Sequence, residues 1–187
     1  SYLAVCNTSP DGIWPVSDWH IGLSRFREDG TILWQKLIYS TVFPDTGYAV
    51  NAVTCDNSGN IYLIGEFFGD SWPAAKITIK LDSTGTILMA KKWVDPLMSY
   101  NIRPTDMNYR NGYIFCSDIK MHRIIIIANG EVSTVEGNNK IQPCSANIGG
   151  RAEDGHKDGN ALTALFSMTK GIAFDSKSNM FMADESN

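Results

Sequence analysis

The chain has 187 residues, of which 43% are hydrophobic and 19% charged, with a formal net charge of −4. This composition is ordinary for a globular domain with a sizeable core. Without a run of lysine or arginine, the chain lacks the basic face that a nucleic-acid interface needs. No apolar run approaches the roughly 18 residues that a membrane-spanning helix needs. We therefore expect one domain, with no nucleic-acid partner and no membrane span.

The predicted elements are short strands separated by turn residues. No window shows the 3.6-residue periodicity of an amphipathic helix, and residues 161–168 are expected to form one helical turn at most. In chain order, strands are expected at Tyr2–Asn7, His20–Phe26, Thr31–Ile38, Ala49–Cys55, Asn60–Phe67, Ala75–Leu81, Thr86–Trp93, Thr105–Tyr109, Gly112–Ser117, His122–Ala128, Glu131–Val135, Lys170–Asp175 and Met180–Asp184.

Two hairpin units recur along the chain. The first has Gly-Thr-Ile-Leu at its turn and occurs at residues 26–36 and 81–91, with a shorter copy at 127–134. The second has the turn Asp-x-x-Gly-Asn, best seen at residues 50–65, with related copies at 107–118 and 171–184. Because Asp and Asn accept backbone N–H bonds and Gly takes the left-handed position, these strings predict tight hairpins.

The last 34 residues, with Asp-Gly followed by two strands around Asp175–Asn179, resemble the NHL repeat of β-propellers. The sequence departs from that repeat at Thr169 in place of Pro, at Ser178 in place of Gly and at Phe181 in place of Tyr. Residues 49–93 also resemble the propeller repeat of bacterial surface proteins (SBBP type). Residues 118–124 match the NHL segment D-x-x-N-H-R-I, with Met121 in place of Asn.

The resemblance implies an all-β fold, a β-propeller built from four-stranded antiparallel NHL-like blades whose ring is incomplete in this chain. The single propeller domain, residues 1–187, is expected to contain a partial blade at 1–40, blades at 41–95 and 96–136, a loop at 137–169 and a partial blade at 170–187. Since propellers have about 4 to 8 blades, these strands cannot close a ring. Either the chain belongs to a larger propeller, or another copy completes its open ends.

The four cysteines do not have the C-x(2–4)-C spacing of a zinc site. We expect Cys6, Cys55 and Cys116 to be buried small side chains rather than disulfide partners, and Cys144 to be the exposed or paired one. The disulfide state stays open at this stage. Asn7-Thr8-Ser9 is a glycosylation sequon, so Asn7 is a candidate modification site and points to an extracellular or cell-surface location.

The residues predict no catalytic, cofactor-binding or metal site. His20, His122 and His156 lack ligand spacing, and no Ser/His/Asp or Cys/His constellation is present. The aspartates 56, 82 and 175 begin turns. By the family resemblance, the carboxylates of residues 118 and 184 tie the turn that follows each strand to backbone N–H groups, with metal ligation as the alternative.

Recognition is expected in the loops at the blade rims, because loops held by a rigid scaffold often carry binding. Trp14 and Trp72 lie in proline-containing loops, and Arg151 and His156 lie in the glycine-rich segment 136–158. These four residues are the candidate recognition residues.

We therefore expect a non-enzymatic binding or assembly module, an NHL-like scaffold that presents loops to a protein or glycan and is part of a larger extracellular or cell-surface protein. Two alternatives stay open. One is a fragment of a propeller lyase or hydrolase with an axial metal. The other is a structural subunit of an oligomer or filament, in which neighbouring copies complete the open blades.

Overall fold

The computed structural model describes residues 1–8, 20–38, 47–68, 76–93, 104–119, 123–128, 146–149, 155–159 and 164–186. Over these residues the secondary structure consists of β-strands β1 to β13, arranged in four antiparallel sheets. None of these residues belongs to a helix long and apolar enough to cross a membrane. The expectation of an all-β fold is confirmed for this part of the chain.

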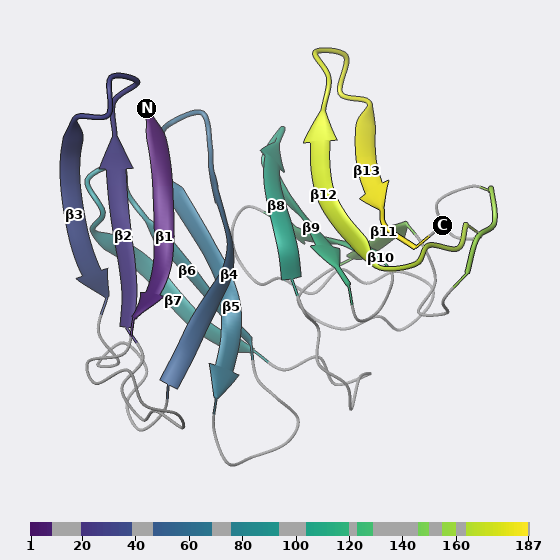
Figure 1. Ribbon diagram of the computed structural model, residues 1–187, viewed down its shortest axis with the longest axis horizontal. Helices are drawn as coiled ribbons and strands as arrows, with labels where there is room; N and C mark the ends of the chain where they lie inside the picture. Colours follow the sequence, from purple (N-terminus) through teal and green to yellow (C-terminus); the bar gives the residue numbers. More distant parts are fainter. Residues whose placement is uncertain are drawn as a thin grey trace.

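The sheets follow one another in chain order (Figure 1). The first contains β1 (Tyr2–Thr8), β2 (His20–Phe26) and β3 (Ile32–Ile38). The second contains β4 (Gly47–Cys55), β5 (Ile61–Phe68), β6 (Lys76–Leu81) and β7 (Ile87–Trp93). The third contains β8 (Pro104–Arg110), β9 (Tyr113–Asp118), β10 (Arg123–Ala128) and β11 (Ala146–Gly149). The fourth contains β12 (Thr169–Phe174) and β13 (Met180–Asp184).

The outer strand of the third sheet differs from the prediction. The partner of β10 is β11, which pairs Ala146 with Ile126 and Asn147 with Ile125. The strand expected at residues 131–135 lies outside the described residues, and the described outer strand of this sheet is β11. β11 also falls inside the segment 137–169 that was expected to be a loop. The local pattern after a turn glycine favours an adjacent hairpin, whereas the strand that pairs here comes from further along the chain.

The segment 161–168, which was expected to form one helical turn at most, contains no helix over its described part, residues 164–168. Leu165 forms an isolated antiparallel bridge with Lys157, and Gly155 N–H donates to the Phe166 carbonyl at 3.2 Å. Ala164 is buried. The segment then bends at residues 167 and 168, where Met168 has φ +57°, before β12 begins.

The tight hairpin turns have the predicted chemistry. Gly59 and Gly85 have φ values of +80° and +79°, and the N–H of each donates at 3.0 Å to the carbonyl of the aspartate that begins the turn. Glycine adopts this left-handed conformation without steric cost. In the fourth sheet Ser178 takes the same position with φ +67°. The departure from the NHL pattern at this residue thus places a side chain in a conformation that favours glycine.

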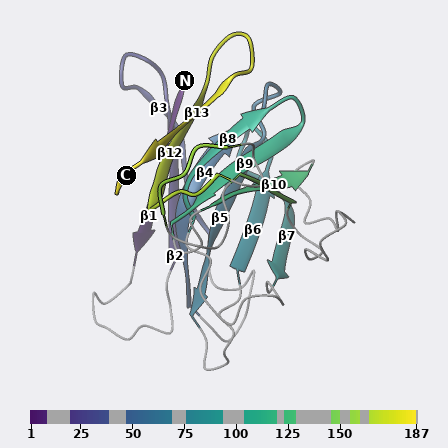
Figure 2. The same ribbon diagram turned by 90° about the vertical axis from the view of Figure 1, so that its right-hand side faces the viewer.

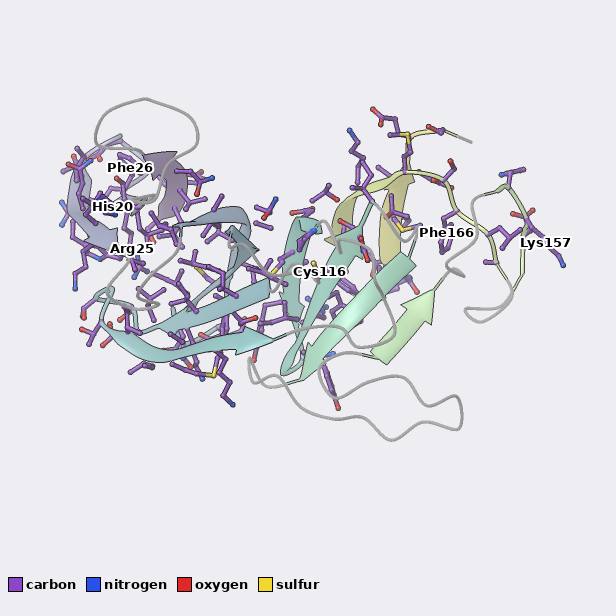
Figure 3. All side chains as sticks on the ribbon, turned by 90° about the horizontal axis from the view of Figure 1, so that it is seen from below. His20, Arg25, Phe26, Cys116, Lys157 and Phe166 are labelled. Carbon is purple, nitrogen blue, oxygen red and sulfur yellow. The ribbon has the colours of Figure 1, made fainter. Side chains whose placement is uncertain are left out.

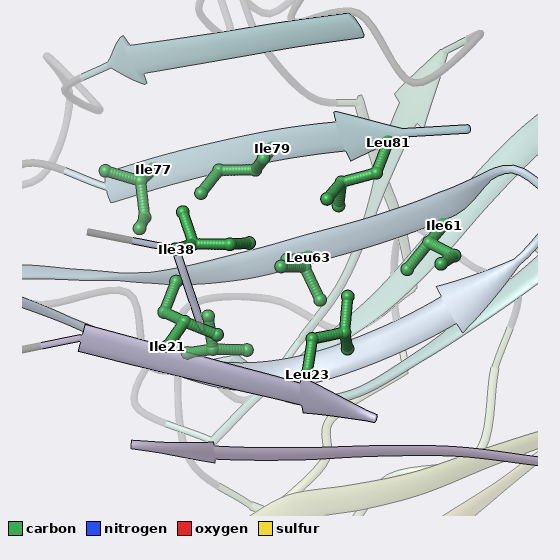
Figure 4. Close-up of a cluster of buried hydrophobic side chains, with 9 residues drawn as sticks. Ile21, Leu23, Ile38, Ile61, Leu63, Ile77, Ile79 and Leu81 are labelled. Carbon is green, nitrogen blue, oxygen red and sulfur yellow. The ribbon is translucent and has the colours of Figure 1, made fainter. Parts of the chain in front are cut away.

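Alternate residues of a strand point to opposite faces of its sheet. In the second sheet, β4 to β6 carry buried side chains on both faces, whereas the outer strand β7 is largely exposed. Towards the first sheet, the buried cluster contains Ile21, Leu23, Ile38, Val50, Ile61, Leu63, Ile77, Ile79 and Leu81 (Figure 4). Towards the third sheet, the cluster contains Ala52, Tyr62, Ile64, Met107, Ile114 and Cys116. Burying each of the large aliphatic side chains contributes about 1.5–3 kcal/mol. These two clusters fix the first three sheets against one another.

The strands at the start of successive sheets lie next to one another: β4 contacts β8, and β8 contacts β12. Seen from below, His20, Arg25 and Phe26 mark the first sheet, Cys116 lies in the third, and Lys157 and Phe166 lie at the opposite end of the molecule (Figure 3). The fourth sheet lies at the near side in Figure 2. The chain therefore builds a row of sheets packed face to face, each against the next.

Candidate functional site

Asp56 holds the turn between β4 and β5 with both carboxylate oxygens. Oδ1 accepts from the backbone N–H groups of Ser58 and Asn60, at 2.9 and 2.8 Å. Oδ2 accepts from Asn60 Nδ2 at 2.7 Å and from the hydroxyl of buried Tyr62 at 3.0 Å. Although burial alone raises the pKa of Asp56, the hydrogen bonds from Asn60, Tyr62 and Ser58 lower it below its usual value. Burial and the bond to Asp56 in turn raise the pKa of Tyr62.

Asp82 and Asp175 hold two further turns in the same way. Asp82 Oδ1 accepts from the N–H groups of Thr84 and Thr86, at 2.8 and 2.9 Å. Asp175 Oδ1 accepts from the N–H of Asn179 at 2.8 Å, and Oδ2 accepts from its amide at 2.8 Å. The hydroxyl of Thr84 and the amide of Asn179 are the main causes that lower the pKa of their aspartates. The prediction that these aspartates form turns is confirmed.

Asp184 and Asp118 both contribute to contacts with the segment around the start of β12. Asp184 Oδ1 accepts from the N–H of Ser167 at 2.7 Å, so this carboxylate binds the segment before β12. Asp118 is fully buried, and its backbone carbonyl accepts from Thr169 Oγ1 at 3.1 Å. Among the residues described, no group of three or more His, Cys, Asp or Glu is placed to hold a metal ion.

Two arginines reach from one sheet to a turn of a later sheet. Arg25 Nη1 in β2 donates to the Ser83 carbonyl at 2.7 Å, and Trp34 Nε1 donates to the same carbonyl at 3.2 Å. Arg110 Nη2 at the end of β8 donates to the Asp175 carbonyl at 3.2 Å, and both its Nε and Nη2 donate to Ser178 Oγ. No sequence pattern predicts these contacts, because each depends on which sheets pack together.

The candidate glycosylation residue Asn7 binds both backbone polar groups of a single residue in the second sheet. Its Oδ1 accepts from Val50 N–H at 2.7 Å, and its Nδ2 donates to the Val50 carbonyl at 2.9 Å. Val50 lies beside a register irregularity of β4, where the ladder to β5 shifts. The amide thus pairs with the backbone of β4 as a strand residue would. Nδ2 is also the atom to which a glycan would attach.

The third and fourth sheets are joined through a further set of polar contacts. Asp106 Oδ2 accepts from the N–H of Ile172 at 2.8 Å, and Asn108 Nδ2 donates to its carbonyl at 3.4 Å. Thr105 Oγ1 donates to the Thr169 carbonyl at 3.1 Å. Side chains of β8 therefore bind the backbone of β12, in the manner of Asn7 on β4.

Of the four predicted recognition residues, only His156 lies in the described part of the chain, where it is exposed. Trp14, Trp72 and Arg151 lie outside the described residues, as does His122. The structure therefore brings no predicted recognition residues together within its described ranges.

The cysteines differ in part from expectation. Cys116 is buried as predicted, whereas Cys6 and Cys55 are exposed, and none of these three cysteines forms a disulfide. Cys6 shares the outward face of β1, which the second sheet does not cover, so burial of this strand is one-sided. Cys144 lies outside the described residues.

No protein-family model matches the chain, and no curated protein matches it in sequence.

Proposed function

We propose that the four sheets are consecutive blades of an NHL-like β-propeller, and that the protein is a non-enzymatic binding or assembly module. The observation that carries this proposal is the burial of β4 to β6 of the second sheet on both faces, between the first and the third. Face-to-face packing of successive antiparallel sheets, with their first strands adjacent, is the arrangement of propeller blades.

The inter-sheet hydrogen bonds support the role of a rigid scaffold. Asn7 and Arg25 fix the first sheet on the second, and Asp106 and Arg110 fix the third on the fourth. Such contacts keep the sheets in one orientation, and a rigid framework lets connecting loops hold a fixed recognition surface. The carboxylates of Asp56, Asp82 and Asp175 each accept hydrogen bonds from backbone N–H groups, which favours a structural role for these three residues.

The proposed partner is a protein or a glycan, bound through loops that contain Trp14, Trp72, Arg151 and His156. An extracellular or cell-surface location belongs to the same proposal, through the resemblance of the second sheet to repeats of bacterial surface proteins. The aromatic and cationic residues in these loops suit stacking on sugar rings and hydrogen bonding to polar groups.

The test is binding by the full chain, immobilised on a biosensor and probed with a glycan library and with purified cell-surface proteins. A ligand of the scaffold should bind saturably and should lose at least about tenfold in affinity in a Trp14→Ala, Trp72→Ala double variant. Tyr113→Ala is the matched control, since Tyr113 is an exposed aromatic residue in β9. Equal losses in both variants would count against loop recognition, and metal-dependent cleavage of a bound glycan would favour the hydrolase alternative.

A further inference from the structure

Aromatic pairs join successive sheets at two places. Tyr62 in the second sheet stacks on Tyr109 in the third, with ring centroids 6.1 Å apart and an interplanar angle of 7°. Phe115 in the third sheet packs on Phe174 in the fourth, with centroids 4.9 Å apart and an angle of 60°. Both geometries lie in the favourable range for aromatic pairs.

The two pairs share one construction. The first member of each lies in the second strand of its sheet, β5 or β9, on the face that points to the following sheet. The second member lies in the first strand of that following sheet, β8 or β12. The interface between the first and second sheets differs, because it is built mainly from aliphatic side chains.

Phe181 occupies the corresponding place in the fourth sheet. In β4 and β5, Thr54 pairs with Tyr62, next to the pair that closes the Asp56 turn. In β12 and β13, Ala173 pairs with Phe181 at the same distance from the Asp175 turn. Phe181 therefore matches Tyr62 in strand, register and distance from the turn.

The face that carries Phe181 points away from the third sheet. Phe174 contacts Phe115, and Phe174 pairs with Met180, so the intervening residues Ala173 and Phe181 lie on the opposite face. Phe181 is 58% exposed, while Ala173 and Ala183 on the same face are also exposed. This face, defined by Ala173, Phe181 and Ala183, carries no charge and is here termed the Phe181 face.

We propose that the Phe181 face is a docking surface for a further antiparallel β-sheet whose first strand presents an aromatic side chain to Phe181. The inference rests on the proposed propeller arrangement and extends it to a specific contact. Aromatic pairs already join the second sheet to the third and the third to the fourth. Phe181 supplies the first member of a third such pair, and the described residues contain no second member for it. Within these residues β13 pairs with β12 alone, so its outer edge is also available to a neighbouring strand.

The experiment adds a sheet that already packs on a face of this kind. The third sheet packs on the face of the second sheet that carries Tyr62, so a second copy of residues 104–149, which contains all four strands of the third sheet, is fused by a flexible linker after the full chain. Hydrogen exchange at the amides of Met180–Asp184 is then compared between the original chain and the fusion. The amides of β5 report whether the rest of the fold is unchanged.

The proposal predicts that exchange in β13 slows in the fusion. Tyr109→Ser in the added copy, or Phe181→Ser in the host, should remove most of the slowing. The two changes together should be non-additive by about 2- to 10-fold, as for an aromatic pair. Tyr113→Ser in the added copy is the control, because Tyr113 is an exposed aromatic of the same sheet. It should leave the slowing in place.

Three results would overturn the proposal. Unchanged exchange in β13, or equal effects of Tyr109→Ser and Tyr113→Ser, would show that the Phe181 face does not receive an aromatic-bearing sheet. Self-association of the original chain that Phe181→Ser abolishes would assign the face to a second copy instead. None of these results depends on ligand binding by the loops, so failure of the recognition proposal is a separate outcome.

Discussion

The side-chain amide of Asn7 binds both backbone polar groups of Val50, although the two residues lie on different sheets and 43 positions apart in the chain. One side chain thereby satisfies an N–H and a carbonyl of β4, the edge strand of the second sheet, next to the point where its register with β5 shifts. Buried or half-buried backbone groups need such partners, because each unsatisfied group costs free energy. The contact explains Asn7 without a glycan.

Asn7→Asp is expected to destabilise the fold. An aspartate retains an acceptor for Val50 N–H but places an anionic oxygen against the Val50 carbonyl, so one hydrogen bond becomes a repulsion. The free energy of unfolding should fall by about 1–3 kcal/mol in a chemical denaturation experiment. Asn57→Asp, the same substitution at an exposed turn residue, is the control and should change stability by less than about 0.5 kcal/mol. Equal effects would contradict the bridging role of Asn7.

Substituting two turn glycines, Gly30 and Gly85, distinguishes the cost of backbone strain from the cost of disturbed packing between sheets. Gly30 and Gly85 have nearly equal positive φ values, +83° and +79°. A Cβ at Gly30 would meet nothing within 4 Å, whereas one at Gly85 would lie 2.9 Å from Lys36 Cδ and 3.2 Å from Trp34 Cη2. Gly30→Ala should therefore cost about 1–2 kcal/mol through the left-handed backbone alone.

Gly85→Ala should cost about 1 kcal/mol more than Gly30→Ala, because Lys36 and Trp34 must shift. The loss of the Trp34 bond to the Ser83 carbonyl should also change the fluorescence of Trp34 in native protein. Thermal or urea unfolding of the two variants side by side gives the comparison. A Gly30→Ala variant that loses as much stability as Gly85→Ala would show that packing of the first sheet against the turn at Gly85 adds no cost.

Substitutions of Asp56 and Asp82 measure how much the hydrogen bond from the Tyr62 hydroxyl to Asp56 contributes to stability. Asp56→Ala removes the acceptor of a buried phenol, whereas Asp82→Ala removes bonds to exposed threonines only. We expect Asp56→Ala to lose about 1–3 kcal/mol more stability in urea unfolding, which is the cost of an unsatisfied buried hydroxyl. In a Tyr62→Phe background that excess should largely disappear. Persistence of the full excess would mean that Asp56 acts through the turn alone.

The turn aspartates also predict how stability depends on pH. Their pKa values are lowered in the folded state, for Asp82 and Asp175 first through side-chain hydrogen bonds. A lowered carboxyl pKa gives stability that is present above the unfolded-state value of about 4 and is lost as pH falls through the folded-state value. The midpoint of thermal unfolding should therefore decrease below about pH 4. An Asp82→Asn, Asp175→Asn double variant should show a smaller decrease, and an unchanged pH profile would contradict this assignment.

The sequence predicted most strands because the signal is local. Asp, Asn and Gly at fixed turn positions, with β-branched and aromatic residues between them, determine where each hairpin bends. All predicted strands other than the one at residues 131–135 match an observed strand within two residues at each end. That strand lies outside the described residues, and the described partner of β10 lies further along the chain, where a local pattern carries no information about pairing.

The inter-sheet contacts could not be predicted in the same way. Arg25 binds a carbonyl 58 positions away, and Arg110 binds one 65 positions away. Neither arginine belongs to a motif, and the sequon at Asn7 does not predict the contact of its amide with Val50. Such contacts follow from the packing of sheets, which strand patterns alone do not specify. The exposure of Cys6 has the same origin, since the sequence did not reveal that one face of the first sheet stays uncovered.

The most direct test of the propeller proposal is electron microscopy of the native protein isolated from its source, with class averages viewed along the short axis. The proposal predicts a ring of about 4 to 8 radial blades around a central channel, with the present sheets fitting consecutive blades. An open row of sheets or a linear stack, with no closed ring in any view, would contradict it.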